Sequence, residues 1–242
     1  MEKVYKSNIY ESFNFDKTIN KINKSFKYIK GLFNDIYDID NENNSSVEIA
    51  DYITTQNIGD IIYKHNRPFA ICCGLADDFS DNTPRYLLLN NKGYDIWSEQ
   101  LKIVPKLKPV YSDNTIIKIK TDIINVDDNG YKNTQIIKNN TNIDYYPAFR
   151  YCANVNINAY LPAINELEYL VYYINDIINI LNKDKRKYKN IIKYLEDIKT
   201  YKRVSSSSYT STHTYYIMDF KTKEVTEKLK DSFAFIIPFI KI

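Results

Sequence analysis

A helical repeat of apolar residues follows Pro162, and strand-like segments lie on both sides of it. Apolar residues spaced three or four positions apart share one face of a helix. Proline is tolerated at a helix start, because its missing N–H would have no intrahelical partner there. We therefore expect a long amphipathic helix whose buried face carries Ile164, Leu167, Val171, Ile174, Ile178 and Leu181.

Short apolar runs before and after this helix indicate β-strands, because they are bounded by polar turns. We predict strands at 59–65, 67–75, 84–90, 116–126, 213–220 and 232–242, the last two flanking a charged turn. Shorter helices are predicted at 133–140 and 146–155, and a further helix at 186–199. Strands, then helices, then strands indicate an α+β fold with a mixed or antiparallel sheet and flanking helices. The first and last thirds of the chain are expected to share one sheet.

Glu166 and Glu168 fall in the first turns of the long helix. Negative charge is favourable at a helix N-terminus. Two residues separated by two positions on a helix do not face each other, so these carboxylates make a poor acid–base pair. We interpret both as structural residues.

Residues 13–35 carry a separate helical signal with a heptad spacing. Its apolar seam consists of Phe15, Ile19, Ile22, Phe26, Ile29 and Phe33. The seam suits either a helix packed on its own domain or a short coiled coil or docking helix for a partner. Residues 36–50 are polar and read as a linker. We therefore divide the chain into an N-terminal helical arm with its linker, 1–50, and one domain, 51–242.

The charge balance argues against nucleic-acid and membrane partners. The net charge is only +3, whereas nucleic-acid surfaces gather Lys and Arg. The densest basic stretch, 183–187, suits a solvated turn between helices. No apolar run reaches the roughly 18 residues of a membrane span, and the first residues lack the apolar core of a signal peptide. We expect no membrane insertion and no export by the Sec route.

The cysteines and histidines do not form a metal or cofactor motif. Cys72, Cys73 and Cys152 are odd in number, and the first two lie in a predicted buried strand, so we expect reduced core thiols. His65 and His213 stand apart from other ligand-type residues. We expect no metal and no cofactor.

Several segments, in order, resemble C-type-lectin-like domains of surface proteins and phages of gut Bacteroidetes. The segments are GDIIYKHNRPFAICCGL with YLLLNNKGYDIWS, then GYKNTQII, YPAFRYCANVNINAYLPAINELEYL, VSSSSYTSTHTYYIMDFKTKEV and SFAFIIPFIKI. The Leu-Pro helix entry and the Ser-rich hairpin are the most specific of them. The resemblance covers about 55–242 and implies a C-type-lectin-like fold with a helical insertion near 183–200.

The chain departs from this family at positions that matter for ligands. Val204 stands where the family usually has Trp, and Pro238 and Phe239 replace its usual arginine-containing end. The Glu-Pro-Asn and Trp-Asn-Asp loops of calcium-dependent lectins are absent, so we expect no calcium-bridged sugar site. Formylglycine-generating enzymes share the broad fold and use a reactive cysteine pair. Cys72 and Cys73 are adjacent on a strand and face opposite ways, so that activity is not carried over.

The Ser-rich segment 205–216 is the strongest candidate for recognition. Catalysis by a serine needs a base held by a third group, and the sequence offers none. Short polar runs rich in Tyr, Ser and Thr suit binding loops instead. The predicted ligand-binding residues are Tyr209, Thr210, Thr212, His213 and Tyr215.

These features predict a phage virion surface or fibre protein with no enzymatic activity, assembled in the host cytoplasm. The abundance of Asn, Ile, Lys and Tyr reflects A/T-rich codons, as in low-GC bacteria and their phages. The domain would bind a host-surface glycan or protein, and the arm would attach it to other virion proteins or form a homo-oligomer. The alternative is a purely structural capsid- or tail-decorating component with no receptor role.

The arm hypothesis predicts the outcome of placing charge in its apolar seam. Replacing Ile22 and Phe26 with Asp is expected to abolish self-association or particle incorporation, because both lie in the seam. Sedimentation measures assembly, and circular dichroism checks that the 55–242 domain stays folded. Unchanged assembly contradicts the role of the arm.

Overall fold

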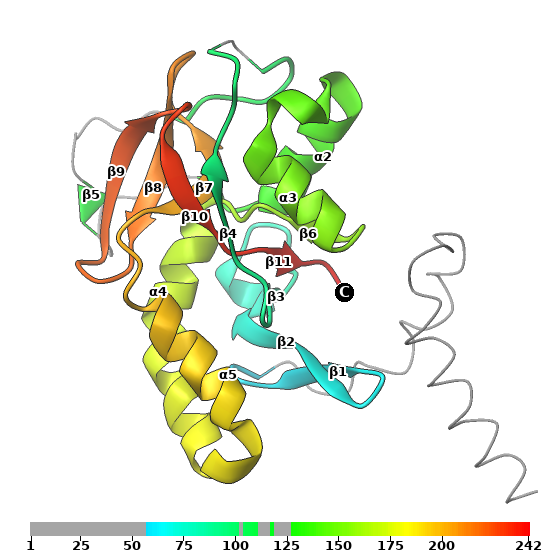
Figure 1. Cartoon of the computed structure of the whole chain (residues 1–242), viewed down its shortest axis with the longest axis vertical. Coiled ribbons are helices and arrows are strands. Elements are labelled where there is room, and N and C mark those ends of the chain that lie inside the picture. Colours follow the sequence, from blue (N-terminus) through cyan, green and yellow to red (C-terminus); the bar gives the residue numbers. More distant parts are fainter. Residues whose placement is uncertain (1–56, 102–103, 111–116, 119–126) are drawn as a thin grey trace, which may run out of the picture. The chain divides into compact units, whose positions relative to one another are not determined.

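A computed structural model describes residues 57–101, 104–110, 117–118 and 127–242 (Figure 1). The predicted arm and linker, 1–50, and most of the predicted strand 116–126 lie outside the described residues. The described part is α+β, with two sheets and four α-helices.

The first sheet joins the beginning and the end of the domain. Its strands, in spatial order, are β1 (Ile61–Lys64), β2 (Arg67–Gly74), β3 (Arg85–Leu88), β11 (Phe239–Ile240) and β6 (Ala159–Tyr160). All neighbouring strands are antiparallel. The predicted sharing of one sheet by the first and last thirds of the chain is thus confirmed.

The second sheet has six strands and is built largely from the C-terminal third. Its order is β4 (Gly93–Ile96), β10 (Phe233–Ile236), β7 (Val204–Tyr209), β8 (Thr214–Asp219), β9 (Glu224–Leu229) and β5 (Ile117–Lys118). The prediction of a plain charged turn between the last two strands is wrong, because β9 occupies most of it. Only Val225 of β9 is fully buried, and antiparallel pairing with β8 along the whole strand holds β9 in place.

Four helices pack against the sheets, close to the predicted positions. They are α2 (Gly130–Asn140), α3 (Pro147–Val155), α4 (Ile164–Asn182) and α5 (Lys185–Ile198). Single 3-10 turns occur at Ala76–Asp78 and Ile143–Tyr145. The N-cap of α4 is Ala163, so Pro162 precedes the cap instead of occupying the first helical turn.

Helix α4 forms the centre of the main hydrophobic core. It packs on β2 of the first sheet, on β7 and β8 of the second, and on α5 (Figure 1). All six residues of its predicted apolar face are buried, at 0–5% exposure. Since one helix face touches both sheets, burial of that face holds the two sheets together.

A second core lies under α2 and α3 on the other face of the six-stranded sheet. Trp97 is fully buried there, with its ring centroid 5.1 Å from that of Phe149 and 5.8 Å from that of Tyr146, both edge-on. Its indole N–H donates to the carbonyl of Ser206 at 2.8 Å. This bond ties the end of β4 to the middle of β7.

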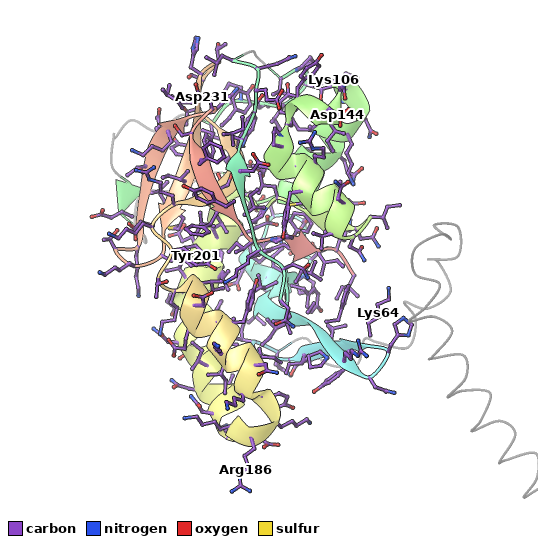
Figure 2. All side chains as sticks on the ribbon, in the orientation of Figure 1. Lys64, Lys106, Asp144, Arg186, Tyr201 and Asp231 are labelled. Atoms are coloured by element: carbon purple, nitrogen blue, oxygen red, sulfur yellow. The ribbon has the colours of Figure 1, made fainter. Side chains whose placement is uncertain are left out.

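The basic stretch 183–187 is exposed and covers the turn between α4 and α5 together with the first residues of α5. Figure 2 shows the side chain of Arg186 pointing outward at the tip of this helical pair. The predicted solvated turn is confirmed. Within the described ranges, no helix is both long and apolar enough to cross a membrane.

The backbone of Gly130 at the start of α2 lies too close to the α4 entry to admit a side chain. An added Cβ would lie 2.4 Å from the carbonyl oxygen of Leu161 and 2.5 Å from the nitrogen of Ala163. Both are backbone atoms, so neither can rotate away. We expect Gly130→Ala to lower the free energy of unfolding by about 2–3 kcal/mol in urea titrations.

Gly93→Ala is the matched control for this substitution. There the added Cβ would meet the ring of Tyr151 at 2.9 Å, and a partly exposed ring can move. Its effect should stay below about 1 kcal/mol. Equal effects at the two glycines would contradict the close backbone approach.

Candidate functional site

The predicted ligand-binding hairpin is largely turned inward. Tyr209 and Tyr215 are 1% and 0% exposed and pack around Trp97, and Thr210 is also buried. The Tyr209 hydroxyl donates to the carbonyl of Leu107 at 2.7 Å. These three residues do not present a ligand surface, because their side chains are buried although they lie next to the hairpin turn. That part of the prediction is corrected.

Thr212 and His213 remain at the surface of the same hairpin, in its turn. The His213 N–H donates to the Ser211 hydroxyl at 3.2 Å, which shapes the turn. Ligand binding by this two-residue turn stays a prediction.

The serine run 205–208 is a buried structural seam. Ser206 donates to the carbonyl of Tyr216 at 2.7 Å. The Ser207 N–H donates to the carbonyl of Pro162 at 2.7 Å, and the Ser208 hydroxyl accepts from the Ile164 N–H at 3.0 Å. The Ser207 N–H and the Ser208 hydroxyl therefore fasten the entry of α4 to β7, and all four serines are buried, so none is placed as an exposed nucleophile.

Arg85, the first residue of β3, is a buried hub that joins separate loops. Its Nε donates to the carboxylate of Glu166 on α4. One terminal nitrogen donates to the Thr83 carbonyl at 2.7 Å and to Asp81 at 3.0 Å. The other donates to the Asp128 carbonyl at 2.8 Å. A guanidinium offers five donors in a rigid plane, so these partners fix the loops on both sides of it.

The Glu166 carboxylate receives donors on both oxygens. Besides Arg85, the hydroxyl of Tyr160 donates to one oxygen at 3.2 Å. The N–H groups of Ala163 and Gly130 donate to the other at 2.7 and 3.1 Å. Burial raises the pKa of this carboxyl, and Arg85 with the two backbone N–H groups opposes the rise. Four donors on two oxygens favour the ionised form. The structural reading of Glu166 is confirmed, and its partner Arg85 was not foreseen.

Asp127 connects this hub to the serine seam. Its carboxylate accepts from the amide of Asn133 and from the hydroxyl of Ser208, the latter at 2.9 Å. The same Asn133 amide donates to Ser207 at 3.0 Å. Burial raises the pKa of Asp127, and the bonds from Ser208 and Asn133 lower it. The residue after it, Asp128, contributes its carbonyl to Arg85, so the hub and the seam form one network.

A pocket of about 260 Å³ opens beside the hub, where β3 begins and the chain leaves β11. The loop before β3 forms one wall with Asn82 and Thr83, and Lys241 closes another. Tyr131 of α2 and Tyr160 of β6 supply aromatic surface, with their rings edge to face at 5.8 Å. The Lys241 ammonium lies 4.5 Å from the centroid of the Tyr131 ring. The pocket thus combines apolar and polar groups on a fixed frame.

The residues that line the pocket offer hydrogen-bonding groups and aromatic surface to a ligand. Among the described residues, no three His, Cys, Asp or Glu side chains are arranged to hold a metal ion. All three cysteines are buried and reduced, as predicted, and burial raises the pKa of Cys72 to about 11. A buried thiol with a raised pKa is a poor nucleophile. Sequence reasoning missed the pocket, because its walls come from segments far apart in the chain.

Comparison with known proteins gives one distant structural match. No protein-family model matches the chain, and no curated protein sequence is similar to it. The solved structure of a fimbrial protein from Bacteroides ovatus ATCC 8483 is similar with a TM-score of 0.48 and 12% sequence identity. The match covers 77% of this chain and 49% of that one, so the chain spans about half the length of the fimbrial protein.

Mutation of the buried Arg85–Glu166 ion pair should lower the free energy of unfolding far more than mutation of an exposed ion pair. We expect Arg85→Met and Glu166→Leu each to cost about 3–5 kcal/mol of unfolding free energy, because each leaves a buried charge without its partner. The double variant should cost clearly less than the sum of the two. Chemical denaturation of all three variants measures this coupling.

The exposed pair Lys92 and Asp197 serves as the matched control, with side chains 48% and 46% exposed. Lys92→Met and Asp197→Leu should change stability by no more than about 1 kcal/mol and show little coupling. Additive effects at Arg85 and Glu166 would contradict the role of the hub.

Proposed function

We propose that this chain is a non-enzymatic recognition protein that binds a host-surface glycan or protein. The observation that carries this proposal is the preformed pocket whose walls are tied to Arg85. A fixed site of mixed polar and aromatic character is suited to ligand recognition. Part of the entropy cost of binding is already met, because the Asp81 and Arg85 side chains are held before a ligand arrives.

A C-type-lectin-like domain is the fold that we propose for 51–242, with 183–200 as its helical insertion. The support is the order of sequence motifs: the opening hairpin, the Leu-Pro entry to a long helix, and the Ser-rich hairpin. Helix α4 begins just after this Leu-Pro, and the Ser-rich segment forms β7. Recognition without calcium agrees with the absent calcium-binding motifs.

We place the protein on a phage virion, as a surface or fibre component. The codon-related composition supports a phage of low-GC bacteria, and the heptad seam at 13–35 suits attachment to other virion proteins or to further copies of the chain. The burial of the serine run and of the thiols argues for recognition over catalysis.

The rival function is a structural virion component without a receptor. It is favoured by two exposed aromatic side chains on neighbouring strands. Tyr94 of β4 is 56% exposed and Phe233 of β10 is 52% exposed, and their rings stack with centroids 5.5 Å apart. Exposed apolar surface of this kind can mark a contact with a neighbouring subunit.

Cell binding tests the recognition function. Fluorescently labelled full-length protein is expected to bind cells of gut Bacteroidetes strains in a saturable manner. EDTA should leave binding unchanged, because no calcium-bridging motif is present. The double variant Thr212→Ala and His213→Ala tests the exposed hairpin turn, and it should weaken binding if that turn contacts the receptor.

Lys221→Met with Thr222→Ala is the matched control, because it changes the exposed turn between β8 and β9. This control should bind like the unmodified protein. Absence of saturable binding to every strain, with the protein still recovered in phage particles, would contradict a receptor role and favour the structural alternative.

A further inference from the structure

We propose that the pocket beside Arg85 binds a single neutral pyranose ring, such as the terminal residue of a glycan, without a metal ion. This inference rests on the proposed recognition function and assigns to it a site and a ligand class. The site lies apart from the hairpin turn at Thr212 and His213, which is formed by different strands.

The size of the pocket limits its ligand to about one sugar ring. Its volume is about 260 Å³. One water occupies about 30 Å³ in the liquid, so the pocket has room for roughly eight or nine waters. Pockets for drug-sized ligands begin at about 300 Å³. A single sugar ring fits this volume, and the rest of a longer glycan would extend out of the pocket.

Two tyrosine rings supply the apolar wall that a sugar requires. Tyr131 is partly exposed at the start of α2, and Tyr160 is buried behind it. Edge-to-face packing at 5.8 Å holds Tyr131 against Tyr160, and Tyr160 packs on Phe239 at 6.1 Å. The C–H groups on one face of a pyranose can pack on such a ring, because the ring face carries negative electrostatic potential.

The opposite wall offers both acceptors and donors for sugar hydroxyls. Asp81 is held in place by Thr83, by Arg85 and by the amide of Asn129, at 2.7, 3.0 and 3.0 Å. Its side chain is still 30% exposed and lines the pocket, so its oxygens can accept from a ligand. The Lys241 ammonium donates from the Tyr131 side. A neutral diol needs both kinds of partner, because each hydroxyl donates one hydrogen bond and accepts others.

The charges in the wall favour a neutral ligand over an acidic one. The Arg85 guanidinium is already engaged by Glu166, Asp81 and two backbone carbonyls. The remaining cation, Lys241, faces the same pocket as the Asp81 carboxylate. A ligand carboxylate would therefore meet Asp81 as well as Lys241. A neutral sugar avoids this repulsion.

Titration with methyl glycosides tests the proposal in the presence of EDTA. The probes are methyl β-D-glucopyranoside, methyl β-D-galactopyranoside and methyl α-D-mannopyranoside. Amide chemical shifts of the ¹⁵N-labelled full-length protein report binding. At least one probe is expected to bind with a dissociation constant on the order of 1 mM, as befits so small a ligand. The shifts should centre on Asn82, Thr83 and Lys241.

Methyl β-D-glucuronide is the matched acidic probe, because it differs from the glucoside only by a carboxylate at C6. It should bind at least tenfold more weakly than the best neutral glycoside. Equal or tighter binding of the glucuronide would overturn the assignment of a neutral ligand.

Three variants locate the binding site. Tyr131→Ala should weaken binding at least tenfold, and Lys241→Met about three- to tenfold. Asn82→Gly removes a lining amide while keeping a backbone with φ of +50°, which glycine adopts readily. It therefore tests the pocket even if Tyr131→Ala does not fold. Lys221→Met, on an exposed turn, is the control for Lys241→Met and should bind normally.

The outcomes separate this inference from the recognition function. No saturable shift at the pocket with any neutral glycoside up to about 50 mM, a concentration well above the expected dissociation constant, would overturn it. Unchanged binding in the pocket variants would also overturn it. Cell binding that persists in that case leaves the recognition function standing. Glycoside binding at the pocket without any cell binding would instead support the inference and count against a host-surface receptor role.

Discussion

The buried ion pair of Arg85 and Glu166 is the constraint on which the polar architecture of the domain depends. A charge removed from water is costly unless an opposite charge and hydrogen bonds replace the lost hydration. Here the Arg85 guanidinium and the Glu166 carboxylate neutralise each other. Backbone carbonyl groups accept further hydrogen bonds from the guanidinium, and backbone N–H groups donate to the carboxylate, so these partners come from three loops. Because Arg85 lies on β3 and Glu166 on α4, the pair can form only when these two elements have come together, and the start of α2 then adds the Gly130 N–H. The conformation of the loops around the ion pair therefore depends on the packing of the elements that carry Arg85 and Glu166.

The pocket follows from the same requirement. The loop 81–84 passes over the guanidinium because its backbone and Asp81 serve as acceptors, and 127–130 does so from the opposite side. The open end of the first sheet lies between them. Asp127 and the serine seam then carry the network to β7, so the small hydroxyl side chains stabilise the entry of α4. The loop 81–84 that lines the pocket and the entry of α4 in the interior thus depend on one connected set of hydrogen bonds.

Local patterns in the sequence predicted most of the elements but little of the site. The apolar face of α4, the helix α5 that follows it and the strands β1 and β2 follow from short-range patterns of apolar residues. The serine run is predicted as an exposed binding segment, because polar residues usually indicate exposed loops, yet β7 is buried and the hydroxyls of Ser206, Ser207 and Ser208 form internal hydrogen bonds. Tyr209 and Tyr215 were placed at the surface for the same reason. The pairing of Arg85 with Glu166 spans 81 positions and has no local signature, so no spacing rule could reveal it or the pocket beside it.

Around Arg85, the residues that stabilise the fold differ from the exposed residues at the rim of the pocket. Arg85, which holds the loops, is buried at the wall of the pocket, whereas Asn82 is exposed and its side chain is not needed to hold the loop. Replacements at such rim positions alter the shape and polarity offered to a ligand and leave the buried charges paired. Under the proposed recognition function, substitutions at this rim would change the ligand preference and would leave the scaffold as it is.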